Sequence, residues 1–251
     1  MTERNNLDDI PLTSNSTGTY DFLSKMEILE AEYQKNKKEE ENEFNLPKSK
    51  KLESKNWKCR KSALEEIKND ILKMEEFDLE IFKLLPKTLI EQHQGNLEFA
   101  LDNIISFFDK KFFIPRENLN ILNDILKHLI EKGFSSSKNQ IKEKSKEAII
   151  KSVENLSNTD ILCENIIKLF ETKNQKLIQS GIIISKILLN LFGSSALNYK
   201  ILTPKFLQLT EQCSPLIKND IISFINELYK WIRGGIRQFL NNVTDSVYAI
   251  L

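Results

Sequence analysis

The sequence predicts an all-α fold, an α-solenoid of about six stacked helical hairpins with a flat paddle shape and no sheet. From Trp57 onward, apolar residues recur almost without pause at the i, i+3, i+4 and i+7 spacing of amphipathic helices. No segment alternates apolar and polar residues between hairpin turns, as a half-buried strand would. Polar turns near Trp57, Asn96, Lys138, Asn174 and Lys218 return about every 40 residues.

That period is typical of HEAT-like repeats, in which each hairpin buries one face against its neighbours. In such a stack, equivalent turns lie along a single edge although they are far apart in the sequence. The turns contain an aromatic residue and several lysines, so the predicted edge is basic. The formal net charge of the whole chain is zero, which argues against attraction of the whole molecule to nucleic acid or to an anionic membrane.

Size and composition allow one large domain with a substantial core. The chain has 251 residues, of which 40% are hydrophobic and 29% charged, and its 7 Gly and 6 Pro suit long helices with polar faces. Its three cysteines, Cys59, Cys163 and Cys213, lack metal-ligand or redox spacing and are expected to be small buried hydrophobes in a reducing compartment.

Two regions are expected. Residues 1–43 form a disordered or partly helical N-terminal extension, in which Tyr20–Glu43 has some helical pattern, and residues 44–251 form the repeat domain. The N-terminus has no apolar signal-peptide core. The strongest apolar run, Gly181–Phe192, contains polar residues and is too short to cross a bilayer, so a soluble cytosolic protein is expected.

Within the repeat domain, helices are interrupted by recognisable turn chemistry. Lys48–Ser54 reads as a basic lead-in, Pro86 is expected to kink its helix, and Gly95 and Asn96 suggest a C-cap followed by an N-cap. Ile236–Leu240 and Ser246–Leu251 resemble the start of one more hairpin. The expected helices are Lys61–Ile71, Phe77–Gln92, Leu97–Phe108, Leu119–Glu131, Ile141–Val153, Thr159–Phe170, Leu177–Phe192, Tyr199–Gln212 and Ile217–Ile232.

Trp57 is one of two tryptophans and lies between basic residues at the start of a helix. Either it plugs the first hairpin, or it is half exposed and anchors a partner, since aromatic residues and Arg dominate binding hot spots. The other tryptophan, Trp231, ends an amphipathic helix beside Tyr229 and is predicted to belong to the core.

The sequence does not predict an enzyme. It has no nucleophile elbow, phosphate-binding glycine loop or HExxH pattern, so no cofactor is expected. His93 and His128 lack ligand partners at metal spacing, and we expect one to be a turn residue and the other to be partly buried. Adjacent carboxylates such as Glu65 and Glu66 face apart on a helix and suit solvation rather than acid–base chemistry.

Three segments resemble the TOG domain, the tubulin-binding module of the microtubule polymerase family. The first is Asn45–Ile67, where that family has a Leu-Pro lead-in, a Lys-x-Trp-Lys-x-Arg turn and a helix. The second is Thr172–Lys176, which is similar to the family's Lys-Asn-Pro-Lys turn with Gln175 in place of proline, and Phe192-Gly193 follows it as in the family. The matching residues of the first segment are Leu46, Pro47, Lys55, Trp57, Lys58 and Arg60.

The third segment is Ile217-Lys218 with Glu227–Trp231, which resembles the family's Val-Arg turn and its Glu-Leu-Tyr-Arg-Trp helix end. Together the three cover about residues 44–251 in the order and spacing of a whole domain. Two turns depart from the pattern. Glu91–Asn96 lacks the family's Asp-Ser-Asn string, and the serine-rich third turn matches only loosely through its lysines.

The resemblance implies that the αβ-tubulin dimer is the partner. Trp57 would be the apolar anchor against one subunit, with Lys58 beside it, and Lys173, Lys176 and Lys218 would pair with carboxylates on the other. The family prefers curved, unpolymerised tubulin and acts at microtubule plus ends, spindles or centrosomes in the cytoplasm. The implied tubulin-binding residues are Trp57, Lys58, Asn96, Lys138, Lys173, Asn174, Lys176 and Lys218.

A single such domain, expected to be monomeric, would sequester tubulin more readily than polymerise it, because family polymerases link several domains. The chain also stops inside what looks like its last hairpin, so a longer protein is expected. Two other readings remain. A generic HEAT-repeat scaffold would bind another protein along its concave helix face. Nucleic-acid binding through the Lys-rich edge is disfavoured by the zero net charge and by the lack of further exposed aromatic residues.

Overall fold

A computed structural model describes residues 26–35, 37, 42–156, 159–195, 197–210 and 214–237. The chain divides into two units, Met1–Pro47 and Lys48–Leu251. In the first unit, residues 26–35 are helical and exposed. The rest of the predicted N-terminal extension lies mostly outside the described residues.

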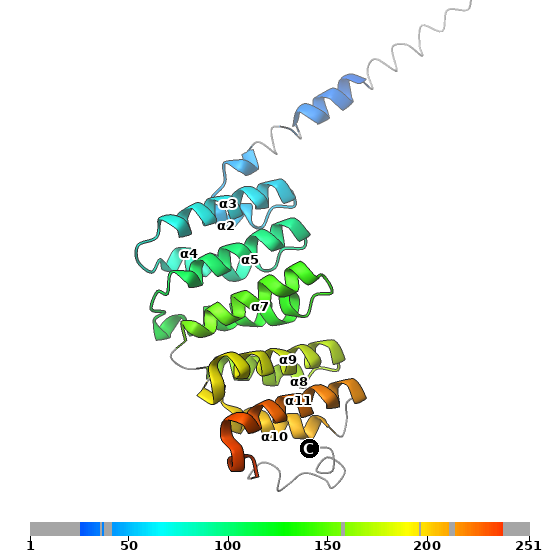
Figure 1. The fold of residues 1–251 in the computed structure, drawn as a ribbon. Helices are drawn as coiled ribbons and strands as arrows, with labels where there is room; N and C mark the ends of the chain where they lie inside the picture. Colours follow the sequence, from blue (N-terminus) through cyan, green and yellow to red (C-terminus); the bar gives the residue numbers. More distant parts are fainter. Residues whose placement is uncertain are drawn as a thin grey trace, which may run out of the picture. The chain divides into compact units, whose positions relative to one another are not determined.

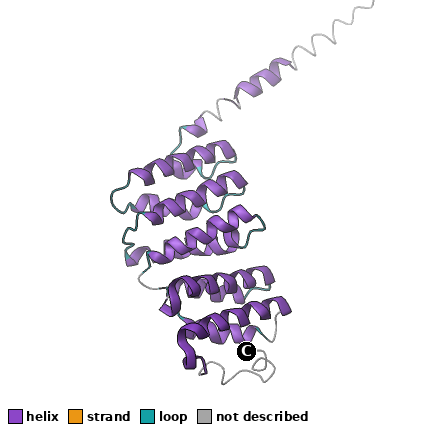
Figure 2. Ribbon diagram, in the orientation of Figure 1, coloured by secondary structure: helices purple, strands orange, loops and turns teal. Residues whose placement is uncertain are grey.

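The described part of the second unit consists of helices and contains no strand, which confirms the predicted all-α solenoid (Figures 1 and 2). It comprises five hairpins, α2/α3, α4/α5, α6/α7, α8/α9 and α10/α11, and most of the expected sixth lies outside the described residues. The α-helices are α2 (Lys48–Lys51), α3 (Trp57–Lys73), α4 (Leu79–Thr88), α5 (Gln94–Asp109), α6 (Leu119–His128), α7 (Asn139–Glu154), α8 (Asp160–Phe170), α9 (Gln175–Phe192), α10 (Tyr199–Leu209) and α11 (Pro215–Ile232). The short helices are η1 (Arg116–Asn118), η2 (Leu129–Phe134), η3 (Gly193–Ser195) and η4 (Arg233–Ile236).

The hairpins stack so that their second helices form one layer and their first helices form another (Figure 1). In the first layer α3 packs on α5, α5 on α7, and α9 on α11; in the second, α4 packs on α6, α6 on α8, and α8 on α10. At the step from the third to the fourth hairpin, the π-helical segment η2 packs against both α7 and α9. One continuous hydrophobic core runs between the layers.

Side-chain hydrogen bonds connect equivalent positions of successive hairpins. The amide of Asn103 donates to the carbonyl of Leu64, 39 residues earlier, at 2.9 Å. The amide of Gln179 donates to Asp220, 41 residues later, at 2.8 Å. These bonds join the first hairpin to the second and the fourth to the fifth at the same spacing as the predicted turns, so the 40-residue period is structural.

Three local features differ from the expectations. The segment read as a lead-in contains the short helix α2, because Lys51 is buried and pairs with Glu66 at 2.5 Å. Helix α5 begins three residues earlier than predicted, with His93 rather than Asn96 as its N-cap. The third hairpin's first helix continues through η2 to Phe134, where a turn was expected.

Trp231 is not a core residue as predicted, because 49% of it is exposed, and the neighbouring Tyr229 is 51% exposed. The indole ring of Trp231 covers Gly193, which has a φ of 75°. A Cβ at Gly193 would lie 3.0 Å from that ring. The contact therefore joins the end of α9 to the end of α11 at the surface of the stack.

By length and composition α9 qualifies as a membrane span, with a mean hydropathy of 1.5 over its most apolar window, although its apolar run was predicted to be too short. Half of that window is buried inside the solenoid, where α9 packs between α8 and α11. A core helix with this packing passes the same test, so the finding is weak evidence for a membrane.

Gly133 allows η2 to approach α7 closely, and this gives a first prediction. A Cβ at Gly133 would lie 2.1 Å from the Oγ and 2.7 Å from the Cβ of Ser145. We expect Gly133→Ala to lower the free energy of unfolding by about 1–3 kcal/mol, because overpacking displaces α7. Urea denaturation followed by circular dichroism measures this. Gly234→Ala is the control, since nothing lies within 4 Å of the added Cβ, and equal effects of the two variants would contradict the prediction.

Candidate functional site

The turns inside the five hairpins lie along one edge of the second unit, and the loops between hairpins lie along the opposite edge (Figures 1 and 2). We call the first of these the turn edge. It comprises residues 52–58, 89–96, 135–138, 171–176 and 210–218, of which 211–213 are outside the described residues. All eight residues predicted from the sequence belong to this edge, so the structure brings together positions that span more than 160 residues.

The first turn presents Trp57 and Lys58 to solvent. The N-cap of α3 is Asn56, whose Oδ1 accepts from the backbone N–H of Lys58 at 3.0 Å. This cap starts the helix at Trp57, which is 42% exposed. Trp57 is therefore neither a core plug nor a freely solvated residue.

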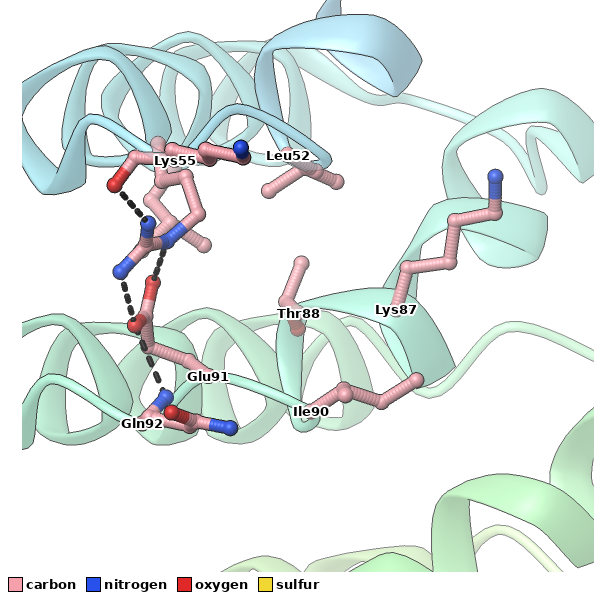
Figure 3. A pocket seen from close by; sticks show the side chains of 9 residues that line it. Leu52, Lys55, Lys87, Thr88, Ile90, Glu91 and Gln92 are labelled. Atoms are coloured by element: carbon pink, nitrogen blue, oxygen red, sulfur yellow. Dashed lines mark hydrogen bonds and ion pairs between the residues drawn. The ribbon is translucent and has the colours of Figure 1, made fainter.

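The second turn is built around the carboxylate of Glu91, which forms a bidentate pair with Arg60 (Figure 3). Both N–H···O distances are 2.7 Å, and the side chains are 18% and 4% exposed. Glu91 also accepts from the backbone N–H groups of Gln92 and His93, both at 2.8 Å. The Nη1 of Arg60 donates to the backbone carbonyls of residues 54 and 55, so one ion pair connects the first two turns.

The environment of this pair favours its charged state. Burial by itself would raise the pKa of Glu91, but hydrogen bonds from Arg60, His93 and Asn96 and the guanidinium charge lower it to about 2. The hydrogen bond to Glu91 raises the pKa of Arg60, against the effect of its own partial burial. Glu91 is thus an ionised structural acceptor at neutral pH.

The second turn also holds Trp57. The imidazole of His93 stacks on the indole of Trp57 with ring centroids 4.6 Å apart and planes inclined by 7°. The side-chain amide of Asn96 donates to the carbonyl of Trp57 at 2.9 Å and to Glu91 at 3.1 Å. Asn96 is only 2% exposed, so this predicted contact residue faces inward, and its place in the site is to position the first turn.

In the third turn, Lys138 is exposed and occupies the N-cap position of α7. Its ammonium group donates to the Oε1 of Gln94 in the second turn. Its backbone N–H donates to the Oγ of Ser136 at 3.2 Å. The serine-rich turn therefore presents one lysine, which is already linked to the neighbouring hairpin.

The fourth and fifth turns contribute the remaining lysines. Asn174 caps α9, and its Oδ1 accepts from the N–H groups of Lys176 and Leu177 at 3.0 and 3.4 Å. Lys173 and Lys176 are exposed, and Lys218 on the first turn of α11 is partly exposed. None of these three lysines has an ion-pair partner within the described ranges. The turn edge therefore has an aromatic end and a basic end.

A cavity of about 410 Å³ lies behind the first two turns (Figure 3). Most of its charged groups are engaged in ion pairs, since Arg60 pairs with Glu91 and Lys87 with Glu53, the latter at 3.0 Å. In the described part of the chain, no group of three His, Cys, Asp or Glu residues could hold a metal ion. The cavity is lined by Leu52, Lys55, Arg60, Leu64, Lys87, Thr88, Ile90, Glu91 and Gln92.

Sequence reasoning missed the roles of Glu91 and His93, and it noted Arg60 only as part of a motif. The Arg60–Glu91 pair joins positions 31 residues apart, and no local pattern indicates it. The sequence could have indicated a contact between His93 and Trp57, because His93 precedes a helix start and lies about one repeat after Trp57. Equivalent turns were already expected to lie side by side.

The fold and the turn edge define an all-α helical-repeat module. The family model of the XMAP215/Dis1/CLASP TOG domain matches residues 43–247. The chain therefore belongs to this family. In a comparison with curated proteins, no relative matches.

Several solved structures share the fold. Drosophila melanogaster Mini spindles TOG3 superposes with a TM-score of 0.67 and 17% identity, covering 81% of this chain and 90% of its own. The TOG domain of C. elegans Zyg9 gives a TM-score of 0.65 and 11% identity, with coverage of 80% and 76%. A structure on tubulin recruitment and assembly by microtubule polymerases with TOG domain arrays gives a TM-score of 0.65 and 16% identity. The match covers 80% of this chain but only 43% of that larger chain.

The Arg60–Glu91 pair gives a second prediction. The folded-state pKa of Glu91 lies below its ordinary value of 4.5, so its stabilisation is complete above about pH 4.5 and is lost as pH falls towards 2. We expect Glu91→Gln to lower the free energy of unfolding by about 3 kcal/mol at pH 7. The variant should also lose less stability than the wild type between pH 4.5 and 2.

Urea denaturation across this pH range measures both effects. Glu117→Gln is the matched control, because Glu117 is exposed. A Glu91→Gln variant with wild-type stability at pH 7 would show that the pair does not hold the turns together.

Proposed function

We propose that this chain binds the αβ-tubulin dimer through its turn edge, captures curved dimers and supports growth of microtubule plus ends. The observation that carries the proposal is the alignment on one edge of Trp57 with Lys173, Lys176 and Lys218, in a chain of the TOG family. Solved TOG domains of the same fold are described in work on tubulin recruitment and TOG–tubulin binding. The proposed setting is the cytoplasmic cytoskeleton, at plus ends, spindle or centrosome.

The two ends of the edge have different roles in this proposal. Trp57 supplies affinity, because desolvating an aromatic side chain in an interface is strongly favourable. The lysines at the other end steer encounter with the acidic dimer and fix its register. The proposed contact residues are Trp57, Lys58, Lys138, Lys173, Asn174, Lys176 and Lys218, with Asn96 acting from behind the surface.

The rigidity of the repeat stack supports a preference for one tubulin conformation. Hydrogen bonds between successive hairpins fix the spacing of the turns before binding, so little ordering entropy is lost. A rigid edge that fits the curved dimer binds the straight form less well, and this difference in affinity produces the preference for curved tubulin. One domain of 44–251 then captures dimers, and productive delivery needs further linked domains.

The third prediction concerns the basic end. Lys173→Glu combined with Lys218→Glu should abolish co-elution with unpolymerised tubulin in size-exclusion chromatography at micromolar concentrations, because two attractions become repulsions. Lys200→Glu with Lys205→Glu on α10 makes the same change in net charge at exposed positions off the turn edge, and it should retain the complex. Wild-type binding should weaken as salt is raised.

The fourth prediction concerns the apolar end. Trp57→Ala should weaken tubulin binding by at least about 30-fold, as expected for a buried aromatic hot spot. Helical circular dichroism should be unchanged, since the side chain is partly exposed and outside the core. Absence of a wild-type complex at micromolar concentrations would contradict tubulin binding. An unaffected Trp57→Ala variant would contradict only the anchor.

A further inference from the structure

We infer that His93 is a positioning residue for Trp57, and that its imidazole fixes the orientation in which the indole faces a partner. The inference rests on the proposed function for its consequence in binding. The arrangement of the two rings exists in the free protein and is testable there. No residue of the second turn other than Asn96 was expected to take part in the site.

The stack is the only ring contact that Trp57 makes among the described residues. Its ring centroids are 4.6 Å apart and its planes nearly parallel, at 7°. Trp57 is the first residue of α3 and is 42% exposed. An aromatic pair of this kind favours one rotamer by a few-fold to about tenfold.

The backbone of Trp57 is held by the same turn. The buried amide of Asn96 donates to its carbonyl at 2.9 Å. The second turn therefore fixes Trp57 at two points, through its carbonyl and through one face of its ring. The exposed 42% of Trp57 is left for a partner, and the cost of ordering the side chain falls on folding rather than on binding.

His93 is itself fixed by the ion pair behind it. Its backbone N–H donates to the carboxylate of Glu91 at 2.8 Å, and Glu91 is held by Arg60. Its Nδ1 accepts from the backbone N–H of Asn96 at 3.4 Å, which makes it the N-cap of α5. A connected series of contacts thus leads from the Arg60–Glu91 pair to the face of the indole.

The two functions of His93, capping α5 and stacking on Trp57, can be separated by substitution. Asn is among the best N-cap residues and lacks a ring, so His93→Asn keeps the cap and removes the stack. Phe has a ring and no acceptor, so His93→Phe keeps the stack and removes the cap. If the ring positions Trp57, His93→Phe restores what His93→Asn loses.

The first readout needs no partner. In a Trp231→Phe background Trp57 is the only tryptophan, and acrylamide quenching of its fluorescence reports how freely the indole is exposed. We expect His93→Asn to raise the quenching constant and His93→Phe to restore it. Unchanged quenching in His93→Asn, or equal quenching in both variants, would overturn the inference whether or not tubulin binds.

The second readout is tubulin affinity for the same two variants. We expect His93→Asn to weaken binding by about 3- to 10-fold and His93→Phe to restore most of the loss, with both variants retaining helical circular dichroism. Equal affinities of the two variants would overturn the role in binding. If Lys173→Glu with Lys218→Glu loses binding while His93→Asn keeps wild-type quenching, the proposed function holds and the inference about His93 fails.

Discussion

The bidentate pair of Arg60 and Glu91 is the interaction on which the candidate site depends. It crosses from the first hairpin to the second, and its carboxylate also accepts from the backbone of the second turn. Removing one partner would leave a buried charge, which is far more costly than losing a surface ion pair. The two turns therefore behave as one unit, and the position of Trp57 is determined by residues 34 to 39 positions further along the chain, from Glu91 to Asn96.

The basic end of the turn edge is organised differently. Asn174 caps α9 through its side chain and so fixes the backbone beside Lys173 and Lys176, while the lysine side chains stay in solvent. A preordered aromatic anchor loses little entropy on binding, whereas flexible lysines keep their entropy until they meet a carboxylate. The edge thus combines a rigid end that supplies affinity with a mobile end that supplies long-range attraction.

Much of the fold could be predicted from the sequence, because apolar periodicity and regular turns reflect the repeat directly. The all-α solenoid and the common edge of its turns are confirmed for the described residues. The inward-facing Asn96 and the exposed Trp231 could not be predicted, because each depends on a contact with another hairpin. The local sequence around Asn96 predicts an N-cap, whereas its amide donates to the carbonyl of Trp57 in the first hairpin. The pattern around Trp231 predicts a core residue, whereas its ring covers Gly193 at the surface. Whether the lysines bind a partner stays a prediction.

The neutral total charge is compatible with a basic edge because ion pairs are distributed unevenly. On α7, Lys144 and Lys151 pair with Asp102 and Asp109 of α5 at 2.7 and 2.8 Å, away from the turns. The lysines of the fourth and fifth turns form no such ion pair among the described residues. Because charges separated by more than about 8 Å are largely screened at physiological salt, a partner responds to the local edge and not to the sum. An acidic surface brought against these turns is therefore attracted by a molecule whose net charge is zero.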